Sequence, residues 1–149
     1  MGKLKVFEDE FTDIQSGMVS LAIEALETAD MTVDKIYIYA FGTEHEGFFN
    51  LFFVKDGRLL HNHQVGVSED IIDQVLNLGI DDTFKLLALC KKYGRQAPCQ
   101  YKLVYDCNTG HFDGDYSYDD LSDSLYGSSG AFDDWEKKTA NSLSGEEKN

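Results

Sequence analysis

Carboxylates and aromatic rings are concentrated in one stretch of the sequence, GHFDGDYSYDDLSDSLYGSSGAFDDWEKK, which spans residues 110–138. Oxygen-bearing side chains stand at alternate positions in its first part: Asp113, Asp115, Ser117 and Asp119. Oxygen ligands at alternate positions are typical of the start of a calcium loop, but an EF-hand also requires glycine at its sixth position and glutamate at its twelfth. Tyr118 and Ser124 occupy those positions, so the sequence argues against an EF-hand.

A second set of candidate ligands lies in the tripeptide HNH at residues 61–63. On a β-strand, His61 and His63 would share one face and could approach the same transition-metal ion. Such an ion needs a third protein ligand, which the sequence does not specify. Nucleophile and phosphate-loop motifs such as GxSxG and GxGxxG are absent. The sequence therefore predicts no catalytic residue, no metal ligand and no cofactor.

The charge of the chain indicates what kind of partner it can bind. The net charge is −14, and residues 113–149 supply half of it with 10 acidic and three basic side chains. Such a surface disfavours direct binding to nucleic acid or to an anionic membrane, because both are bound through lysine and arginine. It favours a basic protein partner, whose association electrostatic attraction would accelerate. The alternative to a basic partner is that the acidic side chains only keep the protein soluble.

Length and cysteine usage restrict the architecture and the compartment. The 149 residues predict one domain over residues 1–140, followed by a flexible tail at 141–149. No run reaches transmembrane length, and the N-terminus lacks the apolar region of a signal peptide. Cys90, Cys99 and Cys107 are odd in number and form no CxxC motif, which is typical of reduced thiols. We therefore expect a cytoplasmic protein, whose oligomeric state the sequence leaves open.

Hydrophobic periodicity predicts an α+β fold. Apolar residues recur at three- and four-residue spacings over 8–29, which indicates an amphipathic helix. Runs of β-branched and aromatic residues predict strands at 34–41, 47–54, 58–65, 99–107 and 111–119. The first two runs are apolar on both faces, so we expect central strands that are covered on both sides.

The remaining segments read as helices and connectors. Residues 68–94 are helical in pattern, with Ser68 as a candidate N-cap and Gly79 as a candidate break between two helices. The GSSG at 127–130 is interpreted as a flexible connector before a short final helix at 131–140. The order of elements predicts a single α+β domain. It contains a mainly antiparallel sheet of about five strands, a meander plus a C-terminal hairpin, with N-terminal, central and short C-terminal helices.

At strand spacing, residues 111–119 divide between two faces. One face carries Phe112, Gly114, Tyr116 and Tyr118, and we interpret its tyrosines as mainly core side chains packed on the preceding strand. The other face carries His111, Asp113, Asp115, Ser117 and Asp119, and the acidic run continues through Asp120 and Asp123.

The C-terminal part of the chain resembles a known family. The segment YKLVYDCNTGHFDGDYSYDDLSD, followed by DDWEKK, is similar to the signature of the YezG-like bacterial immunity proteins. In that signature a strand ending in Asp and a turn containing TG precede a DYxYxDLSD-like run and a short helix with Trp and Glu. Upstream, DKIYIYA, the KDG turn and GRQAP follow in the same order. The resemblance covers residues 10–138 and is most specific at 106–123.

The resemblance implies an immunity protein, or antitoxin, that catalyses nothing. Such a protein stays in the cytoplasm and neutralises a cognate secreted polymorphic toxin, typically the C-terminal nuclease domain. The implied partner agrees with the charge, because a nuclease cleft that binds phosphate is usually basic.

We therefore expect the acidic run and two aromatic residues after it to contact the toxin. The expected contact residues are Asp113, Asp115, Asp119, Asp120, Asp123, Tyr126 and Trp135. Trp135 has an alternative role, which is to hold the last helix on the sheet. Two other functional classes stay open. One is an acidic adaptor that binds several basic proteins, and the other is an enzyme or metal-binding regulator that uses His61, His63 and the carboxylates of 113–119.

Overall fold

The computed structural model describes residues 6–122 and 124–145 of the chain. The expected contact residue Asp123 therefore lies outside the described residues. In chain order the elements are α1 (Phe7–Thr28), β1 (Lys35–Gly42), β2 (Gly47–Lys55), β3 (Arg58–His61), a 3-10 turn (Asn62–Gln64), α2 (Glu69–Lys92), β4 (Gln100–Asp106), β5 (Phe112–Ser117) and α3 (Gly127–Ser144).

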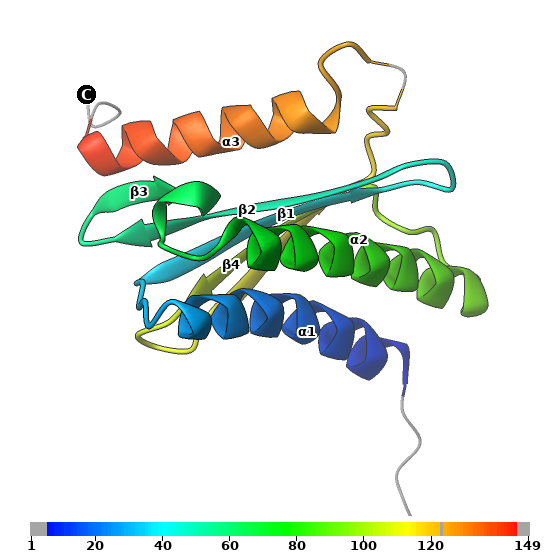
Figure 1. Ribbon diagram of the computed structural model, residues 1–149. Helices are drawn as coiled ribbons and strands as arrows, with labels where there is room; N and C mark the ends of the chain where they lie inside the picture. Colours follow the sequence, from blue (N-terminus) through cyan, green and yellow to red (C-terminus); the bar gives the residue numbers. More distant parts are fainter. Residues whose placement is uncertain (1–5, 123, 146–149) are drawn as a thin grey trace, which may run out of the picture.

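The described strands form one antiparallel sheet in the order β3-β2-β1-β4-β5. Helices α1 and α2 cover one face of this sheet, and α3 covers the other (Figure 1). The architecture is therefore α+β, as the order of elements predicts.

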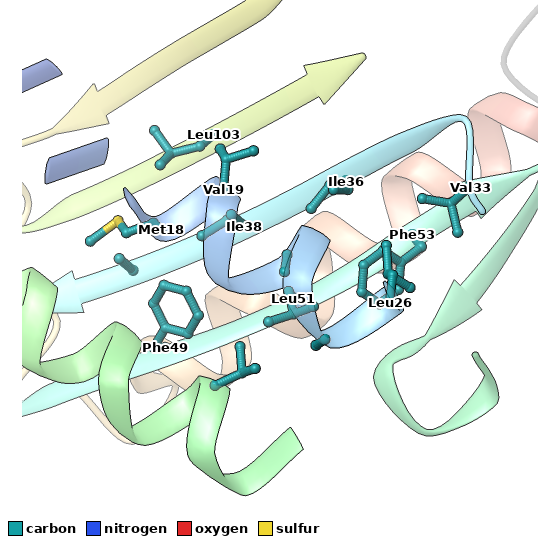
Figure 2. Close-up of a cluster of buried hydrophobic side chains, with 14 of the residues drawn as sticks. Met18, Val19, Leu26, Val33, Ile36, Ile38, Phe49, Leu51, Phe53 and Leu103 are labelled. Atoms are coloured by element: carbon teal, nitrogen blue, oxygen red, sulfur yellow. The ribbon is translucent and has the colours of Figure 1, made fainter. Parts of the chain in front are cut away.

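The face under α1 and α2 holds the larger hydrophobic core. Strand β1 contributes Ile36 and Ile38 to it, and β2 contributes Leu51 and Phe53 from alternate positions. These side chains meet Met18 and its neighbours on α1 (Figure 2). Because side chains alternate across a strand, the intervening residues of β1 and β2 must point to the opposite face.

The opposite face is aromatic and packs against α3. Tyr39, Phe41 and Phe52 are buried there together with Phe132 of α3. The ring centroids of Phe52 and Phe132 lie 5.8 Å apart. The expectation that β1 and β2 are central strands covered on both sides is thus confirmed.

Helix α2 is continuous, so the predicted break at Gly79 is wrong. A Cβ atom at this position would lie 2.3 Å from ring carbons of Phe49 on β2. Glycine is therefore required for the close approach of α2 to the sheet and does not end a helix. Ser68 does cap α2, since its hydroxyl accepts a hydrogen bond from the Ile71 N–H at 3.3 Å.

Two predicted boundaries also differ from the structure. The segment predicted as a strand at 58–65 leaves the sheet after His61 and turns into the 3-10 helix. The GSSG at 127–130 is the first turn of α3 and not a flexible connector. Helix α3 extends to Ser144, so residues 141–144 of the predicted tail are helical, and Gly145 caps the helix.

The alternation predicted for 111–119 holds over the residues that are in β5. Tyr116 turns toward α1, where its hydroxyl donates to Gln15 Oε1 at 2.9 Å. Its ring packs edge-to-face on Phe11, with the ring centroids 5.7 Å apart. Tyr116 is nevertheless 40% exposed and Tyr118, which follows the strand, is 54% exposed. The interpretation of these tyrosines as mainly core is therefore wrong, because no described element covers the outer side of β5.

Candidate functional site

A groove of about 310 Å³ lies between α3 and the β4–β5 hairpin. Strands β4 and β5 provide one wall through Lys102 and Asp115, and the segment after β5 provides Asp119. Helix α3 provides the other wall through Trp135, and Tyr126 lies just before this helix. Four of the seven expected contact residues, Asp115, Asp119, Tyr126 and Trp135, therefore line one groove.

Trp135 has a structural role and also borders the groove. Its indole packs edge-to-face on Tyr37 and Phe52, with ring centroids 5.6 Å and 5.2 Å away. On the groove side, the Lys102 ammonium lies 5.7 Å from the indole centroid, within the range of a cation–π contact. The alternative role of Trp135, which is to hold the last helix on the sheet, is confirmed, and Lys102 lies on the side of the ring that lines the groove.

Tyr126 and Asp134 form a hydrogen-bonded pair at the rim. The Tyr126 hydroxyl donates to Asp134 Oδ2 at 2.6 Å, and the tyrosine side chain is about half exposed. This hydrogen bond, with a smaller contribution from burial, raises the pKa of Tyr126. The phenol is therefore held in place as a neutral donor beside the Asp134 side chain.

Gln100 holds the backbone after β5 in place, a role that the sequence analysis missed. Its Nε2 donates to the main-chain oxygen of Asp119 at 3.1 Å, and its Oε1 accepts from the Tyr39 hydroxyl at 2.8 Å. Gln100 is buried beneath the groove, where an amide needs such partners. The position of Asp119 thus depends on a chain of contacts that reaches the aromatic face of the sheet.

The other expected acids are placed differently. Asp113 is exposed on β5, two residues before Asp115 and on the same face of the strand. Asp120 borders a separate hollow of about 710 Å³ with Thr43 and Arg95. The pKa of Asp120 is lowered because its carboxylate accepts hydrogen bonds from the Ser122 hydroxyl and N–H. The structure therefore does not bring Asp113 and Asp120 into the groove.

The histidines do not share a strand face as the sequence suggested. His61 ends β3 while His63 lies in the 3-10 turn, and their rings stack with centroids 5.7 Å apart. His61 Nδ1 lies 2.6 Å from Glu136 Oε2 of α3, so this histidine contacts the helix. Within residues 6–122 and 124–145, no group of three or more His, Cys, Asp or Glu side chains is arranged to hold a metal ion.

Comparisons with known proteins find no family model and no curated protein that matches the chain. None of the helices in the described part of the chain has an apolar stretch long enough to cross a membrane.

Proposed function

We propose that the chain is an immunity protein that neutralises a cognate toxin domain, most simply a nuclease, in the cytoplasm of the cell that makes both. The observation that carries the proposal is the groove, where the carboxylates of Asp115, Asp119 and Asp134 lie beside two aromatic rings and outnumber the lining lysines, Lys102 and Lys138. The net charge of −14 and the resemblance of residues 10–138 to YezG-like immunity proteins support the same partner.

The groove suits cationic side chains of a protein partner. Asp115 and Asp119 are exposed, so their charges attract a basic surface while the partner is still at a distance. Tyr126 offers an aromatic ring over which arginine or lysine stacks favourably, and a cation of the partner at Trp135 would replace the contact that Lys102 makes there. Aromatic residues beside charged ones are also common among the residues that dominate binding energy. Binding at this surface would cover the basic cleft through which a nuclease holds phosphate.

Co-expression with the toxin domain encoded by a neighbouring gene tests the proposal. The wild-type chain should restore growth and form a stoichiometric complex with the purified domain. The combined change Asp115→Asn with Asp119→Lys should slow association by ~10-fold or more, because electrostatic steering contributes factors of this size. Asparagine is chosen at 115 because this residue lies opposite Lys102 on β4, where a second lysine would repel.

The matched control makes the same change in charge on the other side of the sheet. Asp73 and Asp81 are exposed residues of α2, so Asp73→Asn with Asp81→Lys alters the net charge equally without touching the groove. We expect this control to protect cells nearly as well as the wild type. A toxin domain that kills cells despite abundant wild-type chain, with no complex in vitro, contradicts the proposal. Equal losses in both variants would mean that total charge, and not the groove, determines binding.

A further inference from the structure

Strand β5 forms an edge of the sheet that the described residues leave open. It pairs with β4 on one side and is the last strand in the order β3-β2-β1-β4-β5. Its four central residues, Asp113 to Tyr116, are all exposed, including the main chain of Gly114. The opposite edge is different, because β3 has only four residues and lies beside α3. An open edge of six residues is long enough to pair with another strand.

The register shows which main-chain groups of β5 face outward. The Asp106 N–H donates to the His111 oxygen at 2.8 Å, and Asp106 lies opposite His111 in the continuation of the β4–β5 register. Hydrogen-bonded and non-hydrogen-bonded pairs alternate in an antiparallel ladder. The N–H and C=O groups of Asp113 and Asp115 therefore point to β4, whereas those of Phe112, Gly114 and Tyr116 point away from the sheet.

The side chains of β5 select what can pair with these groups. Asp113 and Asp115 lie on the face that α3 covers, and Phe112 and Tyr116 lie on the face that α1 covers. Between the two aromatic residues Gly114 has no side chain. A strand added to β5 would therefore place alternate residues beside two carboxylates and the others beside exposed aromatic surface.

Charge opposes a second copy of this chain as the added strand in the register centred on Gly114. Two copies of β5 paired antiparallel about Gly114 would place Asp113 of each opposite Asp115 of the other. These are non-hydrogen-bonded positions, where Cα atoms lie only about 4.5 Å apart, and like charges directly opposite are destabilising. The same carboxylates would attract lysine or arginine at those positions of another strand.

We propose that β5 is a docking edge for an extended segment of the partner protein in which basic and apolar residues alternate. The segment adds antiparallel to β5 as a sixth strand of the sheet. Its basic residues face Asp113 and Asp115, and its apolar residues cover Gly114 and the exposed side of Tyr116. The main-chain groups of Phe112, Gly114 and Tyr116 form the hydrogen bonds. The identification of the partner as a toxin rests on the proposed function, but the docking edge itself does not.

A peptide probe tests the edge without any toxin. The probe is the capped heptapeptide KVKVKVK, added to the full chain while amide hydrogen exchange is followed by NMR. At a peptide concentration ten times the dissociation constant, exchange at Phe112, Gly114 and Tyr116 should slow by ~10-fold. The capped peptide EVEVEVE should produce no such slowing. Equal protection by both peptides, or protection only at other strands and helices, would overturn the proposal.

Two matched pairs separate strand pairing from simple charge attraction. N-methylation of the valines, whose N–H groups would face β5, should abolish binding, whereas N-methylation of lysines, whose N–H groups would point away, should preserve it. In the protein, Gly114→Pro removes the central outward N–H and should weaken binding ~10-fold, the effect of about one hydrogen bond. Gly114→Ala retains that N–H and should bind more tightly than Gly114→Pro, although both variants place a Cβ 2.6 Å from the Tyr116 hydroxyl.

Equal affinity for the two methylated peptides overturns the docking edge, even if Gly114→Pro fails to fold. This result would leave cell protection by the wild-type chain, and hence the proposed function, unaffected. Conversely, a chain that protects no cell but pairs with KVKVKVK as described supports the edge and contradicts the toxin as its partner. A stable dimer of the free chain that Gly114→Pro dissociates would overturn the proposal in favour of a second copy.

Discussion

Replacement of Gly79 by alanine should destabilise the protein, although alanine is the better helix former. In an unobstructed helix the change from glycine to alanine stabilises by about 0.5–1 kcal/mol. At Gly79 the new Cβ would lie 2.3 Å from two carbons of the Phe49 ring. Phe49 is only 3% exposed, so its ring cannot swing into solvent and either α2 or β2 must shift.

The expected magnitude follows from these two opposing effects. Overpacking a buried site costs about 1–3 kcal/mol, and contacts this short belong at the upper end of the range. After the gain in helix propensity, Gly79→Ala should lower the free energy of unfolding by about 2–2.5 kcal/mol. For a chain of this length that corresponds to a decrease in Tm of ~4–10 °C.

Gly17 provides a matched control. It lies within α1, and no atom outside its own helix is within 4 Å of a Cβ built there. Gly17→Ala should therefore stabilise by about 0.5–1 kcal/mol. Chemical denaturation of both variants measures the difference, and Phe49→Leu added to Gly79→Ala should recover part of the loss. A Gly79→Ala protein that is as stable as the Gly17→Ala protein would refute the requirement for close helix–sheet contact.

Three other changes test contacts elsewhere in the fold. Trp135→Ala removes the indole that packs on Tyr37 and Phe52. It should lower the free energy of unfolding by about 3 kcal/mol or somewhat less, because the ring is only partly buried. Denaturation followed by circular dichroism measures this loss. Tyr101→Phe should be neutral or stabilising in the same assay, because the buried Tyr101 hydroxyl has no hydrogen-bond partner among the described residues, and a loss above about 1 kcal/mol would contradict this. Asp34 accepts a hydrogen bond from the Asp56 N–H, which lowers the pKa of its carboxyl in the folded protein. Its stabilising contribution is therefore complete above about pH 4 and disappears as the pH falls through the lower folded pKa, so Asp34→Asn should flatten the acid limb of the stability profile.

Most of the fold could be predicted from the sequence because local patterns determine it. The spacing of apolar residues in 8–29 and the aromatic runs of β1 and β2 leave few alternatives, and these elements agree with the structure to within a residue or two. The errors occur where tertiary contacts, and not the local sequence, determine the secondary structure. In the sequence Gly79 suggests the end of a helix, and only the packing of α2 against Phe49 shows why glycine is required there. Likewise, residues 127–130 are poor helix formers. They form the first turn of a helix that is stabilised by the packing of Phe132 and Trp135 on the sheet.

The candidate site was only partly accessible to sequence reasoning. Strand periodicity correctly places Asp113 and Asp115 on one face, but it does not show which helix covers that face. Only the position of α3 brings Asp115, Asp119, Tyr126 and Trp135 together and leaves Asp120 at another hollow. Gln100 was missed because a polar residue at the start of a strand usually faces solvent. A signal did exist, since Gln100 and Lys102 alternate with the core residues Tyr101 and Leu103 and so belong to the α3 face.

The chain contains a single tryptophan, and its indole forms part of the groove wall. Tryptophan emission from the unaltered protein thus comes from one known place, without a label or an engineered probe. A molecule that enters the groove would displace water from the indole and move the Lys102 ammonium, and both events change the wavelength or yield of fluorescence. A titration that leaves the spectrum unchanged while a complex forms would indicate contact elsewhere on the protein, such as the outer side of β5.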